Sequence, residues 1–216
     1  MAVRRSRESP MTNGGVVDAH VHFWDPRVLR YPWLDALPDL NRPFAPSDYA
    51  TATRNVPIAK VVVVECNCAP EESDREVAYF ERLMQIEPRL AGIVAFADLT
   101  DEREIACVLE RLGASPKVKG VRQNIQGQPP GFCLQRTFVN GVQLAGRRGL
   151  TFDLCATHDQ LAEVVTLVEQ CPDTRFVLDH CGKPAIRTHQ VDPWRTHIAR
   201  LAASENVWGK LSGLLT

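Results

Sequence analysis

The chain has 216 residues, of which 44% are hydrophobic and 24% are charged, and its formal net charge at pH 7 is −1. This balance is that of an ordinary globular protein, long enough to bury a substantial core. It gives no electrostatic basis for binding nucleic acid or an anionic membrane, and no apolar run reaches the length of a transmembrane helix.

The N-terminal segment and the cysteines indicate the compartment. Residues 1–15 carry arginines but no apolar segment after them, which predicts a disordered tail rather than a signal peptide, with a transit peptide as the alternative. The seven cysteines are odd in number and unevenly spaced. Cys66 and Cys107 fall inside predicted strand or helix patterns, which indicates reduced thiols and a cytoplasmic protein. Cys66-x-Cys68 has no second paired motif, so we expect no structural zinc site there.

The first predicted strand leads into a pair of histidines, His20-Val21-His22. Side chains alternate along a strand, so His20 and His22 project from the same face, and Trp24 follows on that face before Asp25-Pro26 ends the strand. Neutral imidazole is a common ligand of first-row metals, which makes the pair a candidate metal site. The alternative is a strand end at which two polar side chains hydrogen-bond a loop.

Regular alternation of strands and helices follows the first strand. A connection rich in proline and aromatic residues spans residues 30–46, a length typical of a functional or lid-like loop. Beyond it, units recur at intervals of roughly 25 to 35 residues, the size of a βα unit. The later predicted strands cover residues 60–65, 91–99, 118–125, 150–156, 175–179 and 207–211. The predicted helices cover residues 46–55, 71–87, 101–112, 137–148, 159–170 and 193–203.

This alternation predicts an α/β fold with a parallel sheet, either doubly wound or closed into a barrel. Neither G-x-G-x-x-G nor G-x-x-x-x-G-K-[ST] occurs, which argues against a doubly wound nucleotide-binding fold. We therefore expect residues 16–216 to form an incomplete (β/α)8 TIM-type barrel of about seven βα units. The sequence predicts no eighth strand and no last helices. We therefore also expect this chain to be a fragment or a truncated gene product.

Polar side chains recur at the carboxyl ends of the predicted strands, where barrel enzymes place their active sites. These side chains are Glu65, Arg122, Asn124, His158, Asp179, His180, Lys210 and Ser212. Each has a purely structural alternative: Glu65 and Arg122 could form an ion pair, His158 could begin a helix, and Lys210 could lie on the surface. Taken together, four histidines, a carboxylate and an arginine are expected to meet at one mouth.

Several sequence runs, in this order, carry a specific resemblance. They are residues 22–26 (His-Phe-Trp-Asp-Pro), residues 31–34 (Tyr-Pro-Trp-Leu), residues 120–122 (Gly-Val-Arg), residues 176–184 (Phe-Val-Leu-Asp-His-Cys-Gly-Lys-Pro) and residues 210–213 (Lys-Leu-Ser-Gly). With these runs the chain resembles the amidohydrolase superfamily, and within it the lactonase-like branch that includes L-fuconolactonase and 2-pyrone-4,6-dicarboxylate lactonase. The resemblance covers nearly all of residues 16–216.

The resemblance implies a hydrolase that opens a sugar lactone or a related cyclic ester. It implies that His20, His22, His158 and His180 are catalytic residues. It also implies that His20 and His22 bind a zinc-like divalent metal, together with His158 and His180. Members of this branch differ in whether they need the metal. The chain departs from the pattern in having Gln123 where relatives often place a histidine. The eighth-strand aspartate that activates the attacking water would lie beyond residue 216.

The resemblance also suggests how a small-molecule lactone would be held. Arg122 is a candidate to bind a substrate carboxylate or hydroxyls through its planar fork. Trp24 and Trp33, with Tyr31, could form a wall facing the sugar, and Glu65 could support a first-strand histidine from behind. The competing hypotheses are a metal-dependent decarboxylase or amidase of the same superfamily, and a catalytically dead truncated barrel. The sequence makes no prediction of oligomeric state.

Overall fold

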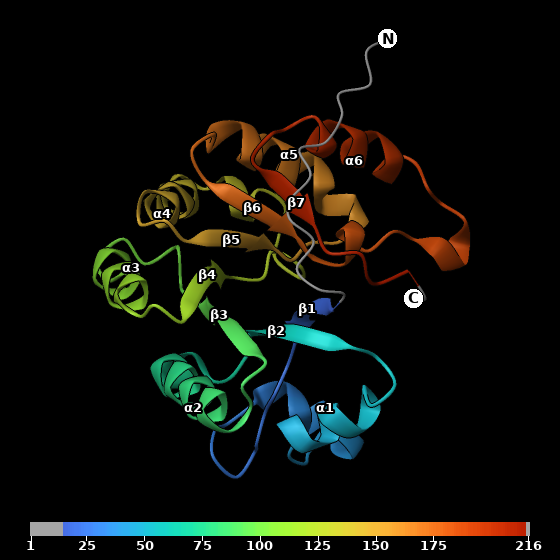
Figure 1. The fold of residues 1–216 in the computed structure, drawn as a ribbon. Coiled ribbons are helices and arrows are strands. Elements are labelled where there is room, and N and C mark those ends of the chain that lie inside the picture. The colour runs from blue at the N-terminus through green and yellow to red at the C-terminus, as the bar shows by residue number, and fades with distance from the viewer. Residues whose placement is uncertain (1–14, 215–216) are drawn as a thin grey trace.

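The computed structural model describes residues 15–214, so the predicted tail over residues 1–15 lies, apart from Gly15, outside the described residues. Within the described range seven parallel strands form one sheet in the order in which they occur along the chain. The strands are β1 (Val16–Val21), β2 (Ile58–Val64), β3 (Leu90–Phe96), β4 (Val118–Arg122), β5 (Thr151–Leu154), β6 (Arg175–Leu178) and β7 (Val207–Gly209). The sheet curls into a half-barrel (Figure 1), which confirms the predicted incomplete (β/α)8 fold.

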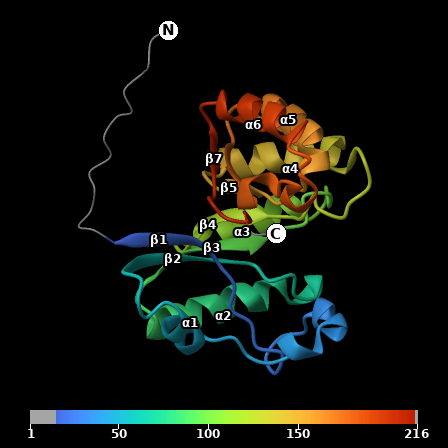
Figure 2. The same cartoon turned by 90° about the vertical axis from the view of Figure 1, so that its right-hand side faces the viewer.

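Over residues 15–214 six α-helices connect the strands and cover the convex side of the curl (Figures 1 and 2). They are α1 (Pro46–Ala52), α2 (Ser73–Ile86), α3 (Ile105–Ala114), α4 (Arg136–Arg147), α5 (Leu161–Gln170) and α6 (Trp194–Ala202). Crossovers of this kind place a helix against the sheet between successive strands, so the central strands are buried on two faces.

The core lies between the helices and the sheet. In β2 the side chains of Val61, Val63 and Val64 are fully buried, as expected of a β-branched run in a parallel strand. Further along, Phe138 on α4 makes an edge-to-face contact with Phe152 on β5, and Phe152 makes another with Phe176 on β6. Ring contacts of this geometry contribute about 0.5–1.5 kcal/mol each beyond area burial. They hold neighbouring βα units in register.

Element boundaries differ from the sequence expectation in ways that local hydrogen bonds explain. Helix α3 begins at Ile105 rather than at Asp101, because the Asp101 carboxylate accepts hydrogen bonds from the backbone of Arg103 and Glu104 and makes a turn. Helix α3 also runs to Ala114, two residues past the expected end at residue 112. Strand β4 ends at Arg122 instead of continuing to Ile125, whose N–H is bonded to the Cys155 carbonyl beyond β5.

The long connection over residues 30–46 is folded rather than open. It contains two short 3-10 helices, Pro32–Ala36 and Pro38–Leu40. Phe44 then pairs with Trp24 in an isolated antiparallel bridge. These contacts hold the connection over the carboxyl end of β1, where the cavity described below opens.

Strands β1 and β7 are the two edges of the described sheet. Val17 on β1 and Trp208 on β7 are each more than half exposed. No helix in the described part of the chain combines the length and the apolar character that crossing a bilayer requires.

Candidate active site at the carboxyl ends of the strands

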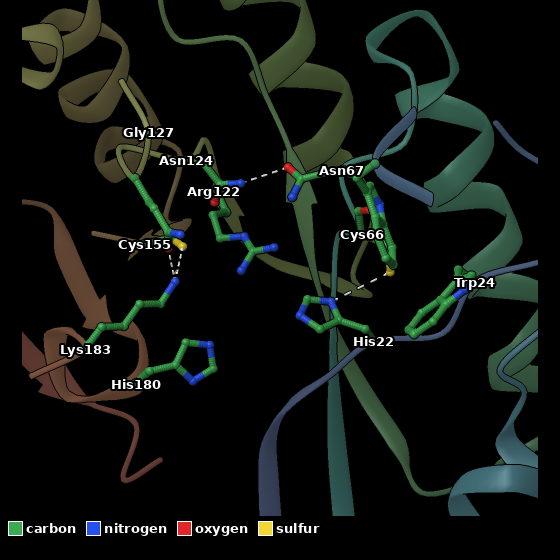
Figure 3. A pocket seen from close by; sticks show the side chains of 12 residues that line it. His22, Trp24, Cys66, Asn67, Arg122, Asn124, Gly127, Cys155, His180 and Lys183 are labelled. Carbon is green, nitrogen blue, oxygen red and sulfur yellow. Dashed lines mark hydrogen bonds between the residues drawn. The ribbon is translucent and has the colours of Figure 1, made fainter. Parts of the chain in front are cut away.

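A cavity of about 460 Å³ opens at the carboxyl ends of β1, β2, β4, β5 and β6. Every lining residue follows a strand end or ends a strand, as the barrel pattern requires. The lining residues are His22, Trp24, Trp33, Cys66, Asn67, Arg122, Asn124, Gln126, Gly127, Cys155, His180 and Lys183. Figure 3 shows His180 and Lys183 on one side of this cavity and Cys66 and Trp24 on the other.

Three of the four histidines expected to be catalytic lie together. His20 Nε2 is 3.0 Å from His22 Nε2. The ring centroids of His20 and His180 are 4.4 Å apart. The fourth, His158, lies on a 3-10 turn four residues past β5, and its Nδ1 is 3.2 Å from the Lys183 carbonyl. His158 therefore lies behind the loop that carries Lys183, and it is absent from the cavity lining.

His180 has an unusual backbone conformation. Strand β6 ends at Leu178, and His180 follows in a short 3-10 segment with φ of 51°, in the left-handed region. A non-glycine residue in this region is uncommon and costs conformational energy. The conformation turns the imidazole toward the cavity, where its Nδ1 is 2.9 Å from Ser212 Oγ beyond β7.

Beneath the histidines lies a buried charged network, defined here as Glu65, Arg122, Asp153, Asp179 and Lys210. Arg122 donates from Nε to Glu65 Oε1 at 2.6 Å and from Nη1 to Asp179 Oδ2 at 3.2 Å. Lys210 pairs with Asp179 Oδ1 at 2.8 Å and with Asp153. All five side chains are at most 7% exposed. Mutual pairing of this kind is what permits charges to be buried.

The network reaches the histidines through Asp179 and Lys210. Asp179 Oδ1 lies 3.3 Å from His20 Nδ1, and Lys210 Nζ lies 3.0 Å from the same nitrogen. Glu65, the carboxylate expected to support a first-strand histidine, instead accepts hydrogen bonds from Arg122 and from the Asn67 backbone. The carboxylate beside His20 is therefore Asp179.

Burial sets the protonation states of the site. It lowers the pKa of His22 to about 3 and that of His180 to about 4, and it also lowers the pKa of His20. Burial raises the pKa of Asp153 to about 6, although Lys210 opposes this shift. Burial also opposes ionisation of Asp179, but its neighbours His20, Lys210 and Arg122 outweigh burial and hold its pKa well below the usual value. Near pH 7 the three histidines are neutral and Asp179 is ionised.

The donor set beside the cavity fits a divalent metal. His20, Asp179 and His180 each offer a ligand atom, and these atoms lie within 4.8 Å of one another. His22 Nε2 adjoins the group through His20. Neutral imidazoles with a carboxylate are characteristic zinc ligands. Asp179 Oδ1 is buried and lies 2.8 Å from Lys210 Nζ and 3.3 Å from His20 Nδ1, so an anionic oxygen lies beside the imidazoles. The group can therefore hold a zinc-like ion.

The aromatic side of the cavity is held by backbone hydrogen bonds. Trp33 Nε1 donates to the Cys66 carbonyl at 2.8 Å, and Trp24 Nε1 donates to the Leu40 carbonyl at 3.2 Å. The two indoles meet edge to face at 5.4 Å between centroids. Tyr31, which was expected beside them, is buried and lies outside the cavity lining. The fixed indoles offer an apolar surface on this side of the cavity.

Sequence reasoning passed over several residues of the site. Asp153, Cys66, Cys155, Gln126 and Lys183 were given no role, although Lys183 stood within a quoted motif. The signal for Asp153 was a carboxylate in the middle of the apolar strand β5 (Thr151–Leu154), where it lies opposite Arg122 in the ladder. An unpaired carboxylate would not be stable there, so its presence predicts a buried cation.

Several known proteins are similar to this chain in sequence. A model of the amidohydrolase family matches residues 17–216. Over 208 residues the chain is 28% identical to an L-fucono-1,5-lactonase from Burkholderia multivorans, covering 93% of this chain and 68% of that protein. An L-fucono-1,5-lactonase from Burkholderia ambifaria is 27% identical with the same coverage.

Solved structures share the architecture. A crystal structure of an amidohydrolase from Burkholderia multivorans with bound zinc superposes with a TM-score of 0.80 at 27% identity, over 93% of this chain and 70% of that one. Two more distant structures show the fold alone. A probable 2-pyrone-4,6-dicarboxylic acid hydrolase from Acinetobacter baumannii has a TM-score of 0.72 at 17% identity, over 91% and 70% of the two chains. A dihydroxybenzoic acid decarboxylase from Polaromonas has a TM-score of 0.59 at 14% identity, over 78% and 66%.

Proposed function

The chain belongs to the amidohydrolase family, and we propose that it is a lactonase, a hydrolase that opens a sugar lactone or a related cyclic ester by attack of water on the carbonyl. The observation that carries the proposal is the cavity in which neutral His22 and His180 lie with an aromatic wall and the Lys183 ammonium. The relatives named as L-fucono-1,5-lactonases support this substrate class over others in the family.

Lactone hydrolysis makes demands that the cavity can meet. Water adds to the carbonyl carbon, the ring C–O bond breaks, and the products are a carboxylate and a hydroxyl group. The reaction therefore needs a base for the water and positive charge or donors near the oxygen that becomes anionic. Lys183 supplies the charge, because its ammonium contacts the neutral groups Gln126 and Cys155, and no described carboxylate pairs with it.

His180 is the group in this chain that we propose accepts a proton from the water. Its imidazole lines the cavity, is neutral near pH 7 and is oriented by Ser212. A pKa of about 4 makes it a weak base, and general-base efficiency falls as the pKa drops below the working pH. The eighth-strand aspartate that the resemblance implies as base has no counterpart in the seven-stranded sheet described here. We therefore propose that turnover by these residues alone is slow.

The remaining predicted site residues have supporting roles in this proposal. His20 and His22 would hold a divalent metal together with the Asp179 carboxylate, which leaves the free nitrogen of His180 available to accept the proton. When bound, such an ion polarises a carbonyl or lowers the pKa of a water. The role of His158 is indirect, through its contact with the Lys183 carbonyl.

Substrate binding is assigned to the lining of the cavity. Trp24 and Trp33 present a surface suited to the apolar face of a sugar ring. Arg122 borders the same cavity, but Glu65 and Asp179 already hold its guanidinium, so we propose that it contributes positive potential rather than a free bidentate fork. Asn67 and Asn124, joined by a 2.8 Å hydrogen bond, offer further groups to substrate hydroxyls.

The expected setting is carbohydrate metabolism in the cytoplasm, with a small-molecule lactone as substrate. The seven cysteines support a reducing compartment, because all are free thiols. Cys66, Cys133 and Cys171 are buried at 4% exposure or less.

The test is an assay of product classes on one preparation. Aldono-1,4- and aldono-1,5-lactones are offered with an acid indicator, hydroxybenzoates with detection of carbon dioxide, and simple amides with detection of ammonia. Acid release from lactones above the rate in buffer is the expected result. Release of carbon dioxide or ammonia would instead favour a decarboxylase or an amidase. Inactivity in all three arms, together with no lactone binding by calorimetry, would favour a catalytically dead barrel.

A further inference from the structure

The chain forms one left-handed turn, residues 180–183, directly after β6. The φ angle is 51° at His180, 52° at Cys181, 68° at Gly182 and 47° at Lys183. Residues other than glycine avoid this region, and those that enter it normally do so singly rather than in a run. Such conformations persist only where the surrounding structure holds them, and they gather at functional sites. We propose that Trp194 is a positioning residue that holds the left-handed turn, and with it His180 and Lys183, in place.

The left-handed turn explains why two side chains three positions apart reach the same cavity. In a helical turn of three residues, the side chains at positions i and i+3 lie on one face. His180 and Lys183 have this spacing, and both line the cavity from the same side (Figure 3). The residues between them face elsewhere, since Cys181 Sγ donates to the Lys210 carbonyl and Gly182 is buried. The turn therefore sets where the imidazole lies relative to the ammonium.

Among the described residues, three contacts from other elements hold the left-handed turn. The Cys181 N–H donates to the Lys210 carbonyl beyond β7 at 3.2 Å. His158 Nδ1 lies 3.2 Å from the Lys183 carbonyl. The shortest contact comes from Trp194 at the start of α6, whose Nε1 donates to the Cys181 carbonyl at 2.7 Å. The middle of the turn is thus held through its N–H from one side and through its carbonyl from the other.

The indole of Trp194 takes the place of a missing backbone donor. In a turn closed by hydrogen bonds between residues i and i+3, the His180 carbonyl accepts from the Lys183 N–H, as observed at 2.9 Å. The Cys181 carbonyl would accept in the same way from residue 184, but Pro184 has no N–H. Trp194 supplies this donor instead. Because the turn cannot close itself at this point, its conformation depends on α6.

Trp194 can act on the cavity only through the left-handed turn. Its half-buried indole packs against the core and is absent from the cavity lining. The inference rests on the proposed roles of His180 and Lys183 and adds to them a residue outside the cavity that places both. Loss of the indole N–H should therefore disturb the imidazole and the ammonium together. A residue that only fills space beside α6 would change the stability of the fold and leave the cavity as it is.

The first test needs no turnover. Trp194→Phe keeps an aromatic ring on α6 and removes the N–H. In NMR spectra of this variant, the backbone signals of His180 and Cys181 should move away from the values typical of positive φ, and the side-chain signals of His180 and Lys183 should shift. Trp208→Phe is the matched control, because Trp208 on β7 is 54% exposed, and it should leave these signals unaltered. Unaltered signals in Trp194→Phe would overturn the proposal.

A double variant separates positioning from loss of packing. Glycine enters the left-handed region about as readily as the ordinary one, so Cys181→Gly should let the turn form without the indole bond. In Trp194→Phe combined with Cys181→Gly, the side-chain signals of His180 and Lys183 should return toward those of the wild type. Failure to recover would contradict the proposal, because Trp194→Phe would then act through the packing of α6.

Hydrogen exchange in the wild type tests the contact itself, including the case in which circular dichroism shows that Trp194→Phe does not fold. The indole N–H of Trp194 should exchange with solvent more slowly than that of the exposed Trp208. Equal exchange rates would overturn the proposal, since the Cys181 carbonyl would then lack its donor.

Kinetics supply the last readout. Trp194→Phe should lower kcat on lactones about fivefold and weaken binding of the aldonate product by a similar factor, as expected for one neutral hydrogen bond. A lower unfolding midpoint with unchanged kcat and unchanged aldonate affinity would show a purely structural role and contradict the proposal. Shifted NMR signals in a protein that opens no lactone would count against the lactonase activity alone. Unaltered signals in an active enzyme would count against the role of Trp194 alone.

Discussion

Lys210 Nζ lies 3.0 Å from His20 Nδ1, although the two residues are 190 positions apart in the chain. The contact joins the region after β7 to β1, the two edges of the described sheet. It places the ammonium of Lys210 between His20, a member of the candidate metal group, and the buried carboxylates of Asp153 and Asp179. Charge balance in the network and the chemistry of the cavity are therefore linked through one side chain.

Lys183 gives the first prediction. Lys183→Met should weaken binding of the aldonate product on the order of tenfold or more, because a hydrogen bond to a charged group contributes about 1.5–3 kcal/mol. Titration calorimetry with the aldonate measures the change. Lys119→Met, at an exposed position on β4 outside the cavity, is the matched control and should leave binding unaltered. Equal affinities of wild type and Lys183→Met for the aldonate would show that Lys183 does not bind it.

Ser212 should act through His180. Removing the 2.9 Å contact in Ser212→Ala loosens the imidazole that we propose accepts the proton. The expected result is a kcat lowered by about fivefold with little change in KM, since a neutral hydrogen bond contributes roughly 1 kcal/mol. Steady-state kinetics on a lactone, with the exposed Ser47→Ala as control, measures this. A change confined to KM would show that Ser212 contacts substrate instead.

The buried network should dominate stability. Arg122→Met leaves Glu65 and Asp179 buried without their guanidinium partner, and breaking a buried pair in this way costs about 3–5 kcal/mol. Arg111→Met removes a pair with Asp74 in which both side chains are more than half exposed, and it should cost at most about 1 kcal/mol. Denaturant unfolding of both variants gives the comparison. A loss in Arg122→Met no larger than in Arg111→Met would be inconsistent with the described network.

Acid should destabilise the protein over a pH range that is set by the pKa values of the buried histidines. The pKa of His22 is about 3 in the folded chain and about 6.5 in an unfolded one, so the unfolded state binds more protons between these values. Stability is therefore fully present above about pH 6.5 and is lost as the pH falls toward 3. Unfolding free energies at pH 7 and pH 5 should differ less in His22→Asn than in wild type. Identical differences would show that His22 is not buried as a neutral group.

The sequence was sufficient to predict the order of the elements because each strand and helix carries its own period of apolar residues. Side chains such as those of Val61, Val63 and Val64 are buried when their strand lies in a parallel sheet. His20, His22 and His180 were identified because strand-end positions converge in any barrel. The approach of Lys210 to His20 depends on how far the sheet curls, which no local pattern encodes.

Lys210 and His158 show most clearly what could not be predicted from the sequence alone. Lys210 could have been a surface side chain by local criteria, and only its pairing with Asp153 and Asp179 explains its burial. His158 was placed at the site because it follows β5, but four residues of turn carry it past the strand end to the Lys183 carbonyl. Side-chain placement beyond a strand end is set by turn geometry and tertiary contacts rather than by strand periodicity.

The most direct measurement of the central claim is the rate of acid release from aldono-1,5-lactones by the wild type, compared with His22→Asn and His180→Asn under the same conditions. Wild-type release should exceed the rate in buffer, and loss of the His180 base should reduce the excess by about 10²-fold, the lower end of general-base contributions. Wild-type acid release no faster than in the two variants, or carbon dioxide as the product instead, would contradict the assignment of this cavity to lactone hydrolysis.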